Sequence, residues 1–240
     1  MMPNLEDKKL AIVTGASRGI GLAIVKSLIA LDYQVIGCSR NPELCDYKHI
    51  QFQLDKVDIV DLPELETWVT KLKAQSRIDL LIHNAGVGYF APLEELNWKQ
   101  INSMIALHLT APMLLTNSLL RELKKSEGRI ILLGSVAGTK ISPWGSVYGA
   151  TKAGLIHFGR EIFQELRKSG VKVTNIIPDM TDTEFYKDLS FGVDEDPRAH
   201  LLASCISEAI KNILSQREGT IISEIVIQPE RFKINKKNRS

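Results

Sequence analysis

The sequence predicts an α/β protein whose core is one doubly wound parallel sheet. Short apolar runs alternate along the chain with amphipathic stretches, which is the pattern of repeated strand and helix units. The runs LLIH at Leu80–His83 and IILL at Ile130–Leu133 are apolar on both faces, as strands buried between two helix layers must be. A chain of 240 residues, 44% of them hydrophobic, can bury one sizeable core.

The predicted strands and helices alternate along most of the chain. We predict strands at Lys9–Val13, Gln34–Cys38, a third ending at Asp55, Asp79–His83, Arg129–Gly134, Lys172–Ile177 and a seventh at Ile221–Pro229. We predict helices at Ile20–Leu31, Leu62–Gln75, Trp98–Lys125, Tyr148–Ser169 and Ala199–Gln216. Pro112 is expected to kink the longest helix. Residues 1–232 should form a single domain, followed by a basic, disordered tail over residues 233–240.

Composition and charge argue against several classes of function. The net charge of +2 is too small to indicate a nucleic-acid partner. Cys38, Cys45 and Cys205 have no CxxC spacing, and the histidines have no ligand-like spacing with acids, so neither disulfides nor a metal site are expected. The N-terminus has no apolar signal core, and no stretch approaches the roughly 20 apolar residues that span a bilayer. We expect a cytoplasmic protein that does not bind membranes.

A glycine-rich turn joins the first predicted strand to the first predicted helix. Gly15 suits a tight turn, Gly19 leaves room for the backbone to approach a pyrophosphate, and Gly21 lets the helix pack closely on the strand. Free amides at the start of a helix then face the phosphates. Three glycines in a turn can also be merely structural, but the position at the first strand–helix junction favours dinucleotide binding.

The end of the second strand favours NADPH over NADH. An acid there would accept a ribose hydroxyl of NADH, whereas a cation would bind the extra phosphate of NADPH. The sequence ends this strand with Ser39 and Arg40 and has no acid. Arg18, within the glycine turn, can reach the same phosphate from the other side.

Tyr148 and Lys152 are four residues apart, so on a helix both side chains project from one face. A cation about 4 Å away would lower the pKa of a phenol by roughly 3, if desolvation is ignored. Such a phenol can give a proton to a carbonyl oxygen. Ser135 follows a predicted strand, at the end where open α/β sheets bind ligands, and its hydroxyl can steady an oxyanion. Taken singly, Ser135 could be a residue that caps a loop, and Tyr148 and Lys152 could share a helix face by chance.

Together these segments resemble the short-chain dehydrogenase/reductase family from Leu10 to about Pro229. The resemblance is carried by TGASRGIG at Thr14–Gly21, NAG at Asn84–Gly86, Ser135 and YGATK at Tyr148–Lys152. It implies a Rossmann-type fold in three layers, with seven mostly parallel strands flanked by helices. It also implies that Tyr148 is the acid/base, that Lys152 holds the nicotinamide ribose, and that Ser135 orients the substrate carbonyl.

The expected cofactor is NADP(H). The residues expected to contact it include Asp55 at the adenine and Thr183 at the nicotinamide carboxamide, both implied by the resemblance. The full expected set is Gly15, Ser17, Arg18, Gly19, Ile20, Gly21, Arg40, Asp55, Asn84, Ala85, Gly86, Tyr148, Lys152, Pro178 and Thr183.

His108 stands where many members of this family carry a fourth catalytic residue, an asparagine. That asparagine is thought to hold a water that links the lysine to solvent. A neutral histidine has one donor and one acceptor nitrogen and could do the same. Two interpretations of His108 stay open, a proton-relay group and a packed helix residue without a part in the chemistry.

The predicted function is NADPH-dependent reduction of a small aldehyde, ketone or 3-oxo compound, or the reverse oxidation of an alcohol. The alternative is an NADP-binding regulatory or sensor protein with little turnover. Trp144, Asp179 and Phe185 are candidates for the substrate pocket, and His83 is expected in the core. The resemblance also implies a homodimer or homotetramer formed through the two long helices. Apolar residues that fit either this contact or burial on the sheet are Leu107, Leu115, Leu119, Ile156 and Phe163.

Overall fold

The computed structural model describes residues 8–75 and 77–237, and its centre is a seven-stranded sheet. The strand order is β10-β6-β5-β4-β1-β2-β3, and every neighbouring pair is parallel. The strands are β1 (Leu10–Thr14), β2 (Gln34–Ser39), β3 (Phe52–Lys56), β4 (Leu80–His83), β5 (Arg129–Leu133), β6 (Lys172–Pro178) and β10 (Glu224–Ile227). The predicted doubly wound fold is confirmed.

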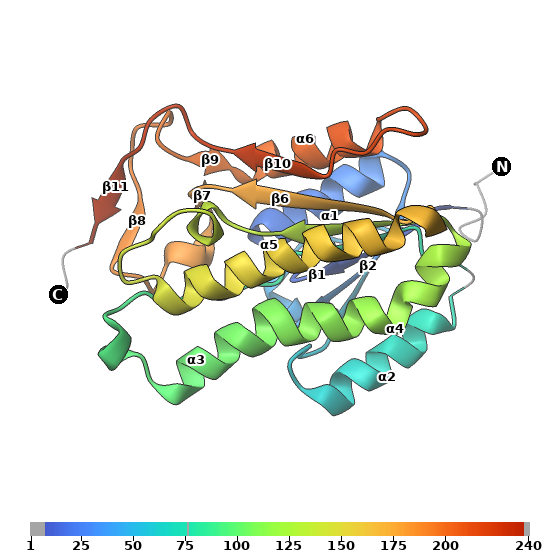
Figure 1. Ribbon diagram of the computed structural model, residues 1–240, viewed down its shortest axis with the longest axis horizontal. Helices are drawn as coiled ribbons and strands as arrows, with labels where there is room; N and C mark the ends of the chain where they lie inside the picture. The colour runs from blue at the N-terminus through green and yellow to red at the C-terminus, as the bar shows by residue number, and fades with distance from the viewer. Residues whose placement is uncertain (1–7, 76, 238–240) are drawn as a thin grey trace.

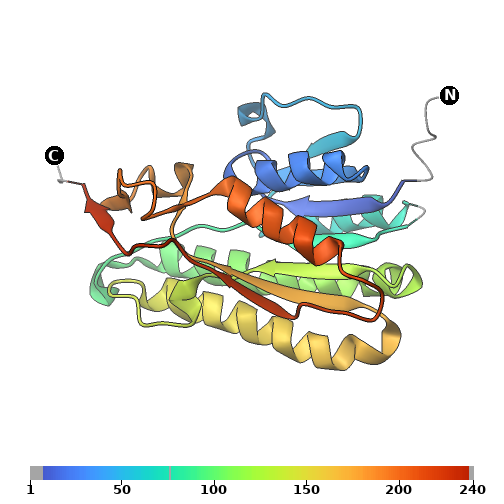
Figure 2. The same ribbon diagram turned by 90° about the horizontal axis from the view of Figure 1, so that it is seen from above.

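Helices cover both faces of the sheet and give three layers (Figure 1 and Figure 2). One face carries α2 (Leu62–Lys73), α4 (Ala111–Lys125) and α5 (Ser146–Leu166); the other carries α1 (Gly19–Ala30) and α6 (Ala203–Leu214). β1 shows why its apolar run is continuous. Leu10 and Ile12 face the first layer, while Ala11 and Val13 face the second.

The longest predicted helix is divided by one turn of π-helix. α3 (Trp98–Ile105) is followed by η4 (Ala106–Thr110), which passes directly into α4. The amide of Ala111 donates to the carbonyl of Ala106, one residue further back than in an α-helix. Pro112 has no amide to offer the His108 carbonyl, which explains the irregular turn before it. The kink expected at Pro112 thus takes the form of a wider helical turn that contains His108.

The same stretch, Trp98–Lys125, is long and apolar enough to cross a membrane by length and composition, with a mean hydropathy of 1.3. The expectation that no stretch approaches a membrane-spanning length was therefore wrong. Many of its apolar side chains, such as Leu115, Leu119 and Leu123, are buried against the sheet. Leu115 and Leu119 thus belong to the core rather than to a surface available for subunit contact, and the same holds for Ile156 on α5.

The loops at the carboxyl ends of the strands carry short elements. They are the helical turns η2 (Pro42–Leu44), η3 (Leu93–Glu95), η5 (Val136–Gly138) and η7 (Glu184–Tyr186) and the strands β7 (Thr181–Asp182), β8 (Phe191–Val193) and β9 (Leu201–Leu202). At the opposite end, η6 (Arg167–Ser169) closes α5. β7 pairs with β9 in a small parallel sheet of its own.

The tail predicted to be disordered over residues 233–240 instead contains a strand. β11 (Ile234–Lys236) pairs antiparallel with β8, at the left of Figure 1. Lys233 forms ion pairs with Asp194 and Asp196, so the basic charge of the tail is matched by acids after β8. Residues 238–240 lie outside the described part of the chain.

Candidate active site

A cavity of about 1320 Å³ opens at the carboxyl ends of the central strands. This volume exceeds the 300–1,000 Å³ typical of a pocket for one small ligand and suits a dinucleotide together with a substrate. It is lined by nearly all the predicted site residues: Gly15, Ser17, Arg18, Gly19, Ile20, Gly21, Arg40, Asn84, Ala85, Gly86, Ser135, Tyr148, Lys152, Pro178 and Thr183. Asp55 and His108 are the two predicted residues that do not line it.

The glycine turn has the geometry that a pyrophosphate requires. Gly15 and Gly19 take left-handed φ angles of 67° and 53°, which favour glycine. A Cβ on Gly21 would lie 2.0 Å from the carbonyl oxygen of Gly15, so no side chain fits there. Arg18, the N-cap of α1, makes no side-chain cap bond. The first amides of α1 therefore remain available to phosphate oxygens at this edge of the cavity.

Asn84, directly after β4, holds this turn in place. Its amide nitrogen donates to the carbonyls of Thr14 and Gly15 at 2.9 and 3.0 Å. The Thr14 hydroxyl in turn accepts the backbone amides of Asn84 and Ala85. The NAG segment thus connects the ends of β1 and β4 below the cofactor cavity.

Asp55, predicted at the adenine, is engaged elsewhere. Its carboxylate accepts bonds from Trp68 Nε1 at 3.0 Å and Lys71 Nζ at 2.8 Å, both on α2. These bonds hold the pKa of Asp55 below its usual value, although burial opposes them. Asp58, three residues later, lines the cavity in its place. Because β3 extends to Lys56, Asp55 still lies within the strand ladder.

Ser135 and Tyr148 are held together by close packing of the loop after β5 on α5. A Cβ on Gly138 would lie 2.7 Å from backbone atoms of Lys152 and Ala153, so glycine permits this contact. The Ser135 hydroxyl accepts the amide of Ala137 at 3.2 Å. Its own proton therefore remains available to a carbonyl or to the Tyr148 oxygen.

Burial dominates the electrostatics of Tyr148. Desolvation raises the pKa of Tyr148 to about 12, and a hydrogen bond with Ser135 opposes the change. Burial thus outweighs the lowering of the Tyr148 pKa that Lys152 was expected to cause. Lys152 Nζ donates to the Leu133 carbonyl at 2.8 Å and lies 5.9 Å from the centre of the Tyr148 ring. Burial lowers the pKa of Lys152 to about 8, so it remains largely cationic at neutral pH.

His108 is buried behind the cavity, with both ring nitrogens bonded to protein. Nε2 accepts the amide of Val87 at 3.1 Å, which assigns the proton to Nδ1. Nδ1 donates to the Thr151 hydroxyl at 2.8 Å, and that hydroxyl donates to the Tyr148 carbonyl. Burial, reinforced by Lys152, lowers the pKa of His108 to about 2. With both nitrogens bonded, the histidine has no free position for a relay water, and the geometry favours a packed, positioning role.

The residues predicted for the substrate pocket line the cavity, whereas His83 lies in the core. Trp144, Asp179 and Phe185 all line the cavity, with Trp144 at the rim and 62% exposed. His83 is buried and bonded to Thr116 at 2.8 Å, as expected for a core residue.

Sequence reasoning missed Asp58 and two rings, Phe90 and Phe191, which also line the cavity. Phe90 lies on the same loop as the NAG segment, which is a signal that could have found it. Phe191 had no such signal, because β8 is positioned by its pairing with β11.

Cys38 is buried and lines the cavity. Cys38, Cys45 and Cys205 are free thiols. Among residues 8–75 and 77–237, no cluster of three or more His, Cys, Asp or Glu side chains could hold a metal ion.

Comparisons with known proteins agree with this geometry. The family model described as short chain dehydrogenase matches residues 9–192. The chain is 33% identical over 201 residues to 3-oxoacyl-(acyl-carrier-protein) reductase FabG of Escherichia coli, with 81% of each chain covered.

Similar solved structures hold nicotinamide dinucleotides. One is an alcohol dehydrogenase from the archaeon Thermococcus sibiricus complexed with 5-hydroxy-NADP (TM-score 0.83, 24% identity, 95% of this chain and 99% of that one). Another is a metagenomic short-chain oxidoreductase in complex with NADP (TM-score 0.76, 28% identity, 92% and 97% covered). Others contain NADH or NAD+. The chain therefore belongs to the short-chain dehydrogenase family and is an oxidoreductase acting on CH–OH or C=O groups.

Proposed function

We propose that the protein uses NADPH to reduce a small aldehyde, ketone or 3-oxo compound, or NADP+ to catalyse the reverse oxidation. The observation that carries this proposal is the meeting of Ser135, Tyr148 and Lys152 with the glycine turn in one cavity. In the reductive direction the cofactor supplies a hydride to the carbonyl carbon.

The side chains of the site would complete the reduction by handling one proton. Ser135 donates a hydrogen bond that holds the substrate oxygen, because its acceptor side already takes the amide of Ala137. Tyr148 is protonated at neutral pH and gives its proton to that oxygen. Lys152, fixed to the Leu133 carbonyl, keeps further N–H donors for the nicotinamide ribose and places a positive charge beside the phenolate that forms.

NADPH is the proposed cofactor because one cation, Arg40, follows β2 in the cavity and a second, Arg18, lies in the glycine turn, while none of the lining residues directly after β2 is an acid. Arg18 and Arg40 are both exposed there and can pair with the 2′-phosphate. Asp58 replaces Asp55 as the proposed contact for the adenosine portion, and Thr183 is retained at the carboxamide. We further propose a cytoplasmic homodimer or homotetramer; light scattering that finds a monomer at micromolar concentration would contradict the assembly.

A panel of aldehydes, ketones and 3-oxo compounds, followed by NADPH absorbance, tests the reaction. The proposal predicts turnover of some carbonyls and a kcat/KM for NADPH above that for NADH. Replacing Arg40 by alanine should weaken this preference roughly 10- to 100-fold, as expected for a lost charge-assisted bond. The matched control, Lys73→Ala, removes an exposed cation from α2. A preference for NADH would contradict the cofactor assignment, and tight NADPH binding without turnover would favour a regulatory or sensor protein.

A further inference from the structure

Aromatic side chains from three separate segments surround Tyr148. The ring centre of Phe90, from the loop after β4, lies 4.9 Å from that of Tyr148, and Phe185 of η7 lies 6.0 Å away. Phe191 of β8 meets the Phe90 ring edge-on at 5.1 Å. Tyr186 closes the group at 5.2 Å from Phe185 and 5.8 Å from Phe191. Phe90 and Phe185 thus pack on Tyr148, and Phe191 and Tyr186 pack on those two rings. We call these four rings the aromatic cage.

Gly88 makes room for two rings of the cage. A Cβ at this position would lie 2.5 Å from Cζ of Phe185 and 2.7 Å from Cε2 of Phe90. Any side chain at residue 88 would therefore push at least one ring away. The loop after β4 and the segment after β7 thus fit together at the edge of Tyr148.

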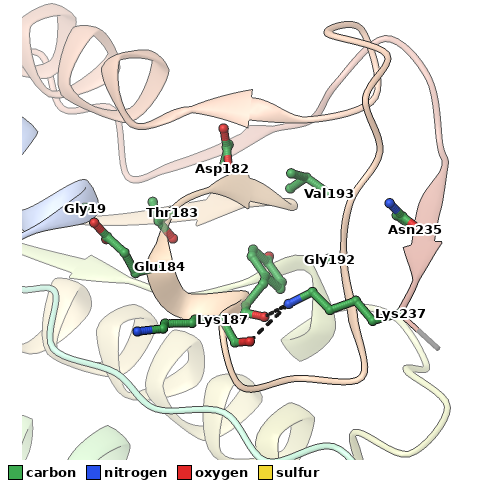
Figure 3. Close-up of a pocket in the computed structure, with 10 residues that line it drawn as sticks. Gly19, Asp182, Thr183, Glu184, Lys187, Gly192, Val193, Asn235 and Lys237 are labelled. Atoms are coloured by element: carbon green, nitrogen blue, oxygen red, sulfur yellow. Dashed lines mark hydrogen bonds between the residues drawn. The ribbon is translucent and has the colours of Figure 1, made fainter. Parts of the chain in front are cut away.

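The end of the chain fixes the other side of the cage. β11 pairs Lys236 with Phe191, and Lys237 Nζ donates to the carbonyls of Tyr186 and Lys187 (Figure 3). Ile234 of the same strand also lines the cavity. The β11 side of these contacts, Ile234, Lys236 and Lys237, lies beyond residues 9–192, which the family model matches.

Several polar groups beside the cage are already engaged. The Asp179 carboxylate accepts bonds from Gln228 and from the amide of Met180. Thr183 Oγ1 accepts the amide of Phe185 at 3.3 Å. Phe90, Phe185, Tyr186 and Phe191 all line the cavity and offer ring faces and edges, which favour stacking against another flat ring.

We propose that the aromatic cage selects carbonyl compounds whose carbonyl carbon bears an aromatic ring. This inference rests on the proposed carbonyl chemistry and adds the substrate class. Aromatic contacts of this kind are worth roughly two- to tenfold in binding beyond the area that they bury. Because the ring takes no part in the chemistry, the preference should appear in KM more than in kcat.

Benzaldehyde, cyclohexanecarbaldehyde and glyoxylate distinguish flat, puckered and charged substituents on the same functional group. The measured quantity is the ratio of kcat/KM for benzaldehyde to kcat/KM for cyclohexanecarbaldehyde. The proposal predicts that this ratio is roughly three- to tenfold lower in Phe185→Leu and in Phe191→Leu than in the wild type. Comparing this ratio between variants cancels the intrinsic reactivity of each aldehyde. The change should lie in KM, with the Kd for NADPH unchanged.

Two further variants keep the test independent of folding defects. Gly88→Ala displaces the rings without removing one, and should shift the ratio in the same direction. Phe163→Leu makes the same substitution on α5 outside the cavity, and should leave the ratio unchanged. The proposed role of the cage is overturned if the ratio is equal in the wild type and all variants, or if the wild type has its highest kcat/KM with glyoxylate.

Failure of the proposed reaction would give a different result. If the wild type reduces none of the three aldehydes, quenching of tryptophan fluorescence measures the binding of benzyl alcohol and cyclohexylmethanol to the NADP+ complex. If benzyl alcohol binds more tightly than cyclohexylmethanol and this difference is lost in Phe185→Leu, the cage selects aromatic ligands and only the proposed carbonyl reduction is contradicted. Equal binding of the two alcohols would contradict the cage.

Discussion

At the scale of single residues, spacing predicted that Tyr148 and Lys152 share one face of a helix but could not predict their protonation. The four-residue interval between Tyr148 and Lys152 puts both on the cavity side of α5, as expected. Their ionisation depends on burial and on the acceptor of the ammonium, the Leu133 carbonyl at 2.8 Å. That carbonyl is identified only when β5 and α5 have packed together.

His108 shows the same limit. The sequence showed that a histidine is unusual at this position. Its hydrogen bonds, however, are made to Val87 and Thr151 from two other segments, which the sequence did not predict. Both bonds are made to the neutral ring. The residue therefore joins the loop after β4 to the helix that carries Tyr148.

We predict that His108→Ala destabilises the protein by about 1–3 kcal/mol, because it leaves the buried amide of Val87 without its acceptor. The pH dependence of kcat should keep its shape between pH 6 and 9, since the ring of His108 does not titrate in that range. Urea unfolding and a pH–rate profile measure the two effects. His157→Ala, at an exposed position on α5, is the control. A profile reshaped only in His108→Ala would restore the relay role.

At the scale of elements, the end of β3 determines which acid lines the cavity. Asp55 and Asp58 are both close to the predicted end of the third strand, and periodicity locates such ends only within a few residues. In the structure β3 continues to Lys56 and turns Asp55 towards Trp68 on α2. The sequence located the turn, and within it Asp58 rather than Asp55 lines the cavity.

Paired variants of these two acids test the assignment. Asp58→Ala should raise the Kd for NADPH roughly two- to tenfold, as expected for one lost hydrogen bond. Asp55→Asn should leave that Kd unchanged and lower the free energy of unfolding by about 1 kcal/mol, because it weakens the ion pair with Lys71. Fluorescence titration and urea unfolding measure both. If Asp55→Asn alone weakens NADPH binding, the original assignment is correct.

At the scale of the molecule, the sheet was predictable and the end of the chain was not. Fully apolar strands and glycine-rich turns are local signals, and they gave the parallel sheet and the cavity at its carboxyl edge. β11 has no apolar alternation, and its partner β8 is distant along the chain. β11 is held by its pairing with β8 and by ion pairs such as that of Lys233 with Asp196, and only the folded chain brings these residues together.

Two buried histidines should make the whole fold sensitive to mild acid. Burial lowers the pKa of His83 to about 3 and that of His108 to about 2, from 6.5 in the unfolded chain. The unfolded state therefore binds more protons below pH 6.5, so this stability is fully present above 6.5 and is lost as the pH falls towards the folded values. We predict a loss of about 2 kcal/mol between pH 6.5 and 5.5, measured by urea unfolding. A constant free energy of unfolding would mean that both rings are protonated within the fold.

Transfer of the proton by Tyr148 in an NADPH-dependent reduction can be tested by measuring kcat of Tyr148→Phe with a carbonyl compound that the wild type reduces. We predict that kcat falls by roughly 10²- to 10⁴-fold, while the Kd for NADPH stays within about twofold of the wild type. Tyr89→Phe removes another phenol that lines the cavity and should keep kcat. A Tyr148→Phe enzyme with the kcat of the wild type would show that Tyr148 does not transfer the proton.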